Sequence, residues 1–143
     1  MSYEFPSPEW VAAYADAINA NEDYKRVGKD WTFGVVAMVV KAEPAVGIAE
    51  DQAMLLDVHQ GQCRGATLVP LSEADSAPFV VVASYAQWKA VIKREVDPTK
   101  ALMQGKLKLT KGHMPTMVRF VNASKALVES TSRIATKFKD EQS

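Results

Sequence analysis

The sequence predicts an α+β domain in which helices cover one face of a five-stranded, mostly antiparallel sheet. Three observations support this fold class. The chain has 143 residues, which suits a single domain built around one core. Hydrophobic residues make up 48% of it and charged residues 24%, as is typical of a folded globular protein. Segments of strand and helix character follow one another in the order α, α, β, β, β, β, α, α, β, α.

Two helices are expected in the N-terminal region, residues 7–29. The run Ser7-Pro8-Glu9 is typical of a helix start, because serine caps the first turn, proline fits the first helical position and a carboxylate favours the positive end of the helix dipole. This helix should extend to about Asn19. Asn21 is expected to cap a second, shorter helix that ends near Gly28.

The sheet and its crossover helices are expected within residues 30–112. Residues 31–41 are β-branched, aromatic and apolar on both faces, which predicts a central strand covered on both sides. Residues 53–60 and 62–70 are expected to form a hairpin. After a polar loop, residues 79–83 should form the fourth strand.

The register of the hairpin is predicted by its turn. If Gln60-Gly61 is a two-residue loop, Val58 faces Cys63 and Asp57 faces Arg64. This register places an apolar pair on one face of the sheet and an ion pair on the other.

Two helices are expected after the fourth strand. Ser84 and Gln87 have the spacing of a capping box, which predicts a helix over residues 85–94. The pair Asp97-Pro98 repeats the combination of cap and proline, and predicts a short helix over residues 99–104.

The C-terminal part should add one strand and one long helix. Residues 106–111 alternate lysine with leucine, which predicts an edge strand with its lysines outward. Residues 114–138 have an apolar stripe of helical period, which predicts a single C-terminal helix. We therefore expect residues 1–143 to form one domain.

Two segments in the second half of the chain resemble a known family. They are SYAQW at 84–88 and VDPTKALMQGKLKL at 96–109. They are similar to the sterol carrier protein 2 domain family, in which an aspartate-proline pair, a short helix ending in methionine-X-glycine-lysine and a following strand recur. The similarity is strongest over residues 79–112. It implies a stand-alone, non-catalytic carrier with an apolar tunnel between sheet and helices, which binds or transfers a sterol, fatty acid, fatty acyl-CoA or phospholipid.

The resemblance also implies which elements line the tunnel. The expected ligand-binding residues are Tyr85, Trp88, Ile92, Leu102, Met103, Gln104, Leu107, Met114, Met117, Phe120 and Val121. Methionine adapts to irregular ligands, although methionines at helical spacing also pack ordinary cores. The Gln104 amide is suited to a ligand head group, and equally to a helix end in solvent.

The charge distribution leaves two interpretations of the basic second half. Lysine and arginine total 17 and aspartate and glutamate total 17, a balance that argues against binding nucleic acid. Lys106, Lys108, Lys111 and Arg119 either steer the protein to anionic lipid head groups, acyl-CoA phosphates or a membrane surface, or protect an exposed sheet edge.

Catalysis and metal binding find little support. Asp57, His59 and Cys63 are the only grouping of nucleophile, base and orienter types, but the predicted register points the thiol to the opposite face from the imidazole. His59 and His113 lack acidic partners at metal-ligand spacing, and no glycine-rich phosphate loop is present. We expect no cofactor, no metal and no enzymatic activity.

An alternative to a lipid carrier is a protein-interaction module that holds a partner segment in the same groove. Val118, Val121 and Phe138 are the residues expected to supply its apolar patch. We expect a cytoplasmic protein, because the sequence shows neither a signal peptide nor a C-terminal Ser-Lys-Leu. The oligomeric state stays open.

Overall fold

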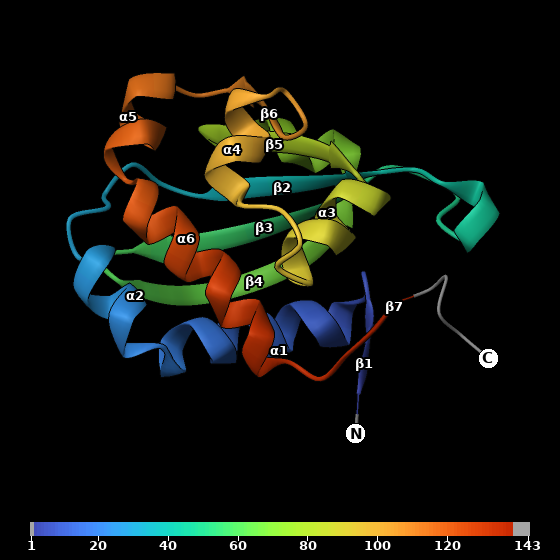
Figure 1. Cartoon of the computed structure of the whole chain (residues 1–143), viewed down its shortest axis with the longest axis horizontal. Coiled ribbons are helices and arrows are strands. Elements are labelled where there is room, and N and C mark those ends of the chain that lie inside the picture. The colour runs from blue at the N-terminus through green and yellow to red at the C-terminus, as the bar shows by residue number, and fades with distance from the viewer. Residues whose placement is uncertain (1, 139–143) are drawn as a thin grey trace.

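The structure is a five-stranded sheet with helices packed on one face (Figure 1). It is a computed structural model and describes residues 2–138. The strands lie in the order β4-β3-β2-β5-β6, and only β2 and β5 are parallel neighbours. Their bounds are β2 (Val36–Lys41), β3 (Gln52–His59), β4 (Gln62–Pro70), β5 (Phe79–Ser84) and β6 (Lys108–Lys111). The predicted fold class is confirmed.

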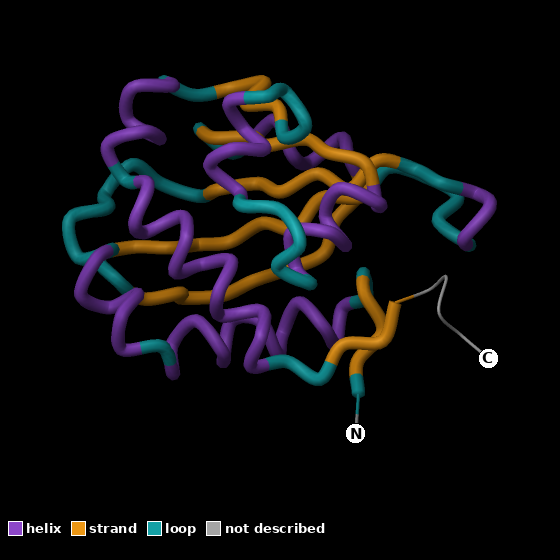
Figure 2. Tube along the Cα trace, in the orientation of Figure 1, coloured by secondary structure: helices purple, strands orange, loops and turns teal. Residues whose placement is uncertain are grey.

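The helices begin at the four caps that the sequence predicted, but the Gln87 side-chain oxygen has no hydrogen-bond partner among the described residues and so does not complete the capping box with Ser84. Ser7, Asn21, Ser84 and Asp97 each accept a hydrogen bond from a backbone N–H of the following first turn. Figure 2 shows the helices crossing one side of the sheet. Their bounds are α1 (Pro8–Ala20), α2 (Glu22–Val27), α3 (Tyr85–Ile92), α4 (Pro98–Met103), α5 (Met114–Arg119) and α6 (Val121–Ser130).

The hairpin between β3 and β4 has the predicted register near its turn. Gln60 and Gly61 have φ of 50° and 83°, the left-handed geometry of a tight two-residue turn. Val58 lies opposite Cys63, and Asp57 accepts a hydrogen bond of 2.9 Å from the Arg64 guanidinium. The register shifts beyond this point through a bulge between Leu56 and Val58, which the sequence did not indicate.

Two strands are shorter than expected. The first central strand begins at Val36 instead of Trp31, because Gly34 has a φ of +101° and interrupts the extended backbone. Trp31 instead packs its ring against other aromatic side chains. The last strand begins at Lys108, and lies at the edge of the sheet as predicted.

The prediction of a single C-terminal helix over residues 114–138 is wrong. The backbone leaves helical geometry at Phe120, whose φ of −100° and ψ of 33° separate α5 from α6. Helix α6 ends at Ser130, and it is followed by a 3-10 turn η3 (Thr131–Arg133) and a strand β7 (Thr136–Phe138). The Ser130 and Thr131 hydroxyls donate to carbonyls of the preceding turn, which favours the bend there.

The two ends of the described chain pair with each other. Strand β1 (Tyr3–Phe5), which the sequence did not predict, runs parallel to β7. Phe5 and Phe138 are buried, and their rings lie 6.0 Å apart. This pairing explains why Phe138, placed by its spacing on a helix, belongs to a strand.

The sheet is covered on its other face by short segments. A 3-10 segment η2 (Leu71–Ser76) packs there over a small cluster that includes Ala37, Val39 and Val80. A second 3-10 turn, η1 (Pro44–Val46), follows β2. The strands are therefore apolar on both sides, and the larger core lies on the helix side.

Asn21 joins the N-terminal helices to α6. Its side-chain oxygen accepts hydrogen bonds from the N–H groups of Asp23 and Tyr24, which caps α2. Its amide nitrogen donates to the Ala126 carbonyl at 3.2 Å and to the Ser130 hydroxyl at 3.0 Å. The residue is 1% exposed, and both of its bonds to α6 lie away from water.

We expect Asn21→Ala to lower the free energy of unfolding by about 2–4 kcal/mol, since it removes the cap of α2 and two buried hydrogen bonds to α6. Ser84→Ala is the matched control, because the Ser84 hydroxyl caps α3 through its bond to the Gln87 N–H; its cost should be about 1 kcal/mol. Urea unfolding of both variants measures the difference. Equal losses would show that the bonds to α6 contribute nothing.

Candidate functional site

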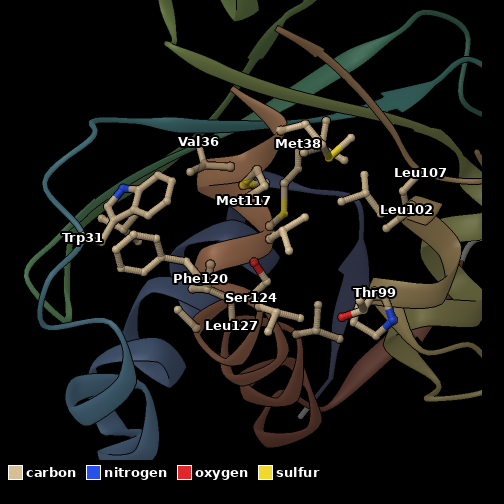
Figure 3. A pocket seen from close by; sticks show the side chains of 18 of the residues that line it. Trp31, Val36, Met38, Thr99, Leu102, Leu107, Met117, Phe120, Ser124 and Leu127 are labelled. Carbon is tan, nitrogen blue, oxygen red and sulfur yellow. The ribbon is translucent and has the colours of Figure 1, made fainter. Parts of the chain in front are cut away.

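A cavity of about 580 Å³ lies between the sheet and helices α4, α5 and α6 (Figure 3). This volume falls within the roughly 300–1,000 Å³ of small-molecule pockets. The residues that line it are Tyr24, Trp31, Val36, Met38, Val58, Val81, Trp88, Pro98, Thr99, Leu102, Met103, Leu107, Met114, Met117, Val118, Phe120, Val121, Ala123, Ser124, Leu127 and Val128.

The sheet forms one wall through alternate positions of its central strands. Val36 and Met38 of β2 face the cavity, whereas Ala37 and Val39 between and beyond them pack into the cluster on the opposite face. Val81 lies beside Met38 in the parallel ladder and also faces the cavity. The β-branched strands thus supply a flat apolar wall.

Helix α6 forms the opposite wall. Phe120, Ala123, Ser124 and Leu127 follow the i, i+3, i+4, i+7 spacing of one helix face. The Phe120 ring meets the Trp31 ring edge-on at 5.1 Å, and Figure 3 shows these two rings together at one end of the cavity.

The position of α6 is set by hydrogen bonds from α1 and from the cap of α2. The Tyr14 hydroxyl donates to the Leu127 carbonyl at 2.8 Å, next to the Ala126 carbonyl that accepts from Asn21. Burial raises the pKa of Tyr14 far above its ordinary value, so the phenol stays protonated and remains a donor. Helix α6 is thereby held toward α1 and α2, at the β4 side of the sheet (Figure 1).

None of the described residues that line the cavity carries a charge. The indole N–H groups in the wall are satisfied by backbone: Trp88 donates to the Val39 carbonyl at 2.8 Å and Trp31 to the Gly34 carbonyl at 3.0 Å. The indoles therefore present carbon to the cavity. An ionised group would be strongly disfavoured inside such a wall.

Three hydroxyl groups are the remaining polar side-chain groups of the described wall. Burial raises the pKa of Tyr24, so its phenol is neutral. Ser124 directs its oxygen into the cavity from α6, and Thr99 lies across from it on α4 (Figure 3). The Thr99 hydroxyl oxygen is buried and has no hydrogen-bond partner among the described residues.

The cavity opens between α4 and α5. Met103 at the end of α4 is 82% exposed, and Val118 on α5 is 59% exposed, although both line the cavity. Met114 at the start of α5 is also exposed. None of the described residues of α5 is buried, and Met117, which is partly buried, packs against the larger core.

The structure brings eight of the eleven predicted site residues to this cavity. They are Trp88, Leu102, Met103, Leu107, Met114, Met117, Phe120 and Val121. Contact between these eight side chains and a ligand stays a prediction.

Three predicted site residues lie elsewhere. Tyr85 packs against Phe5, with the rings 6.1 Å apart, Ile92 borders a small pocket behind Trp88, and Gln104 is an exposed cap at the end of α4. The sequence did not indicate the sheet wall, because nothing local tells which face of a doubly apolar strand meets the helices. The other lining residues that were not predicted are Tyr24, Trp31, Pro98, Thr99, Val118, Ala123, Ser124, Leu127 and Val128.

Cys63 lies outside the cavity. Its thiol is buried and donates to the Gly65 carbonyl at 3.3 Å, and burial raises its pKa. Asp57 instead forms the ion pair with Arg64 on the other face of the hairpin. Among residues 2–138 there is no group of three or more histidine, cysteine, aspartate or glutamate side chains placed to hold a metal ion. Within the same range, no helix has the length and hydropathy needed to cross a bilayer.

The fold and the site define an α+β protein with a ligand-sized, uncharged cavity beneath its helices. The model of the SCP-2 sterol transfer family matches residues 16–125. The chain belongs to this family, and the resemblance seen in the sequence is confirmed. Membership supports lipid binding or transfer as the general class of function.

Solved structures agree with this assignment. A crystal structure of sterol carrier protein 2 is 32% identical, with a TM-score of 0.84, and the match covers 90% of this chain and 98% of that one. A solution structure of a conserved hypothetical protein from Thermus thermophilus, described as a possible sterol carrier protein, is also 32% identical, with a TM-score of 0.84 and coverage of 96% and 94%. The apo sterol carrier protein 2 of Yarrowia lipolytica is 14% identical, with a TM-score of 0.53 and coverage of 83% and 86%, and shares the fold. No curated protein matches the chain.

We expect Thr99→Val to raise the free energy of unfolding by about 1 kcal/mol, because it replaces an unpartnered buried hydroxyl with a methyl group of the same shape. Thr131→Val is the matched control, since the Thr131 hydroxyl donates to the Val128 carbonyl and its loss should lower stability by about 1–2 kcal/mol. Chemical denaturation of the empty protein gives both values. A loss of stability in both variants would contradict this interpretation of Thr99.

Proposed function

We propose that this chain binds one lipid molecule in the cavity and carries it without chemical change. The observation that carries the proposal is the uncharged, apolar wall around about 580 Å³. Each methylene moved from water into such a wall contributes about 0.8 kcal/mol. A long acyl chain or a sterol body therefore supplies enough driving force to offset the cost of association.

The wall also suggests how the lipid is oriented. Because no described residue of the wall is charged, the apolar body of the ligand enters, and an ionised head group stays at the mouth beside Met103 and Val118. An uncharged hydroxyl or ester can go deeper, where the Ser124 hydroxyl is available as a hydrogen-bond partner. The cargo is thus a sterol, fatty acid, acyl-CoA or phospholipid, with the acyl-CoA and phospholipid head groups outside.

Selection among these ligands follows from the same wall. It attracts hydrocarbon and offers hydroxyl groups as its polar partners, so it discriminates against charge more than between one acyl chain and another. One methylene more or less changes the binding free energy by about 0.8 kcal/mol, which is roughly fourfold in affinity.

The protonation and the position of the Cys63 thiol support a carrier function without catalysis. Its raised pKa keeps the thiol protonated and therefore a poor nucleophile. It also lies away from the cavity, so it is not placed to attack a bound lipid.

The interaction-module alternative finds less support. It needs an exposed patch formed by Val118, Val121 and Phe138. Phe138 is buried in the β1–β7 pair, away from α5, and Val121 lines the cavity. These three residues therefore do not form one exposed patch.

We expect a stoichiometric lipid to remain on the gently purified protein, because the apolar wall is unfavourable in contact with water. Native mass spectrometry followed by organic extraction identifies it. A mass without adduct, unchanged after incubation with fatty acid, acyl-CoA, phospholipid and sterol, would contradict the carrier function.

We expect Ser124→Trp to weaken uptake of a fluorescent fatty acid at least about tenfold, because the indole fills space that the chain needs. Asn122→Trp is the matched control: it places the same side chain on the exposed face of α6 and should leave uptake unchanged. Fluorescence titration of both variants, with circular dichroism to confirm folding, measures the effect. Unchanged uptake by a folded Ser124→Trp protein would place the ligand elsewhere.

A further inference from the structure

The mouth of the cavity combines exposed apolar side chains with a one-sided charge. Met103, Met114 and Val118 are three of the five large hydrophobic side chains that are exposed among the described residues. All three also line the cavity. Water-exposed apolar side chains gathered at the entrance of a cavity mark a surface that meets another apolar phase.

The segment that forms this mouth is purely basic. From Pro98 to Val128 the chain has six lysines and arginines and no aspartate or glutamate. They are Lys100, Lys106, Lys108, Lys111, Arg119 and Lys125, and all six are exposed. Of the ion pairs found among residues 2–138, none involves these six.

The elements of this segment lie together in space. Figure 1 shows α4, β6 and α5 grouped at the top of the view, at the β6 edge of the sheet and away from the N-terminal helices. Lys108 is the first residue of the edge strand β6 and Lys106 precedes it, and both are exposed. Lys111 is partly committed to structure, because its ammonium donates to the Asp75 carbonyl.

We propose that the rim formed by α4, β6 and α5 docks on an anionic lipid surface, with Met103, Met114 and Val118 entering the interface and the rim lysines pairing with head-group phosphates or carboxylates. This proposal rests on the proposed carrier function. It places the cavity mouth against the membrane, so that a lipid passes from bilayer to cavity without crossing water. Protection of the edge strand explains the lysines of β6, but not the exposed apolar residues of α4 and α5 or the lack of acidic residues in the sequence of this segment.

The test is co-sedimentation of the full chain with phosphatidylcholine vesicles that contain or lack phosphatidylserine. We expect tighter binding to the anionic vesicles, weakened by salt. The variant Lys106→Gln/Lys108→Gln should bind them about fivefold more weakly for each lysine removed. The matched control Lys29→Gln/Lys41→Gln removes two exposed lysines of the N-terminal half and should bind as wild type does.

A second variant tests the contribution of the exposed apolar side chains of the rim to vesicle binding. Met103→Ser/Val118→Ser should bind anionic vesicles more weakly than wild type, whereas Leu71→Ser, which removes an exposed leucine on the opposite face, should not. Equal binding to both vesicle types, or equal behaviour of the rim variants and their controls, would overturn the proposal.

Uptake of a fluorescent fatty acid in vesicle-free buffer separates the two proposals. Lys106 and Lys108 lie outside the cavity, so their variant should take up the probe normally. If wild type takes up the probe but does not prefer anionic vesicles, the docking proposal alone fails. If wild type does not take up the probe at all, the carrier function fails first.

Discussion

The cavity depends on where α6 is attached. A helix with an apolar face would ordinarily settle onto the sheet and exclude the space beneath it. Here two carbonyls near the C-terminal end of α6, at Ala126 and Leu127, accept hydrogen bonds from Asn21 and Tyr14 of the N-terminal region. Both donors are buried, so breaking these bonds would leave polar groups without partners. This requirement holds α6 to one side and keeps its apolar face over open space.

Local chemistry in the sequence was enough for the caps, the hairpin turn and the edge strand. In each of these, a few neighbouring residues determine the geometry, as Asp57 and Arg64 do for the register. Local chemistry was not enough where contacts with distant segments determine the secondary structure. The spacing of Ile134 and Phe138 fits a helix as well as a strand, and the choice is made by Phe5 at the other end of the chain. The motif around residues 96–109 indicated the family, because it is a continuous run of residues that can be recognised without knowledge of the fold.

The candidate site also has one part that local sequence predicts and another part that depends on distant segments. The helical wall was predictable from the apolar face that begins at Phe120, whereas the sheet wall was not, because Val36 and Ala37 are both apolar and only the tertiary fold decides which faces the helices. Tyr85 lies on the same helix as the cavity-lining Trp88, yet Phe5 of the β1–β7 pair packs against it and removes it from the cavity. Sequence patterns therefore find the elements that surround a cavity more readily than the individual side chains that line it.

The elements around the cavity are not equally buried. An apolar cavity without contents forfeits dispersion contacts along its whole wall, so the empty protein gains by contracting around it. The sheet cannot move inward, since its strands are packed on both faces, and α6 is fixed by its buried hydrogen bonds. Helix α5, with none of its described side chains buried, is the element that can adjust at least cost. Under the proposed carrier function, α5 would adjust the volume of the cavity at its mouth, and lipids of different length would share the wall formed by the sheet and α6.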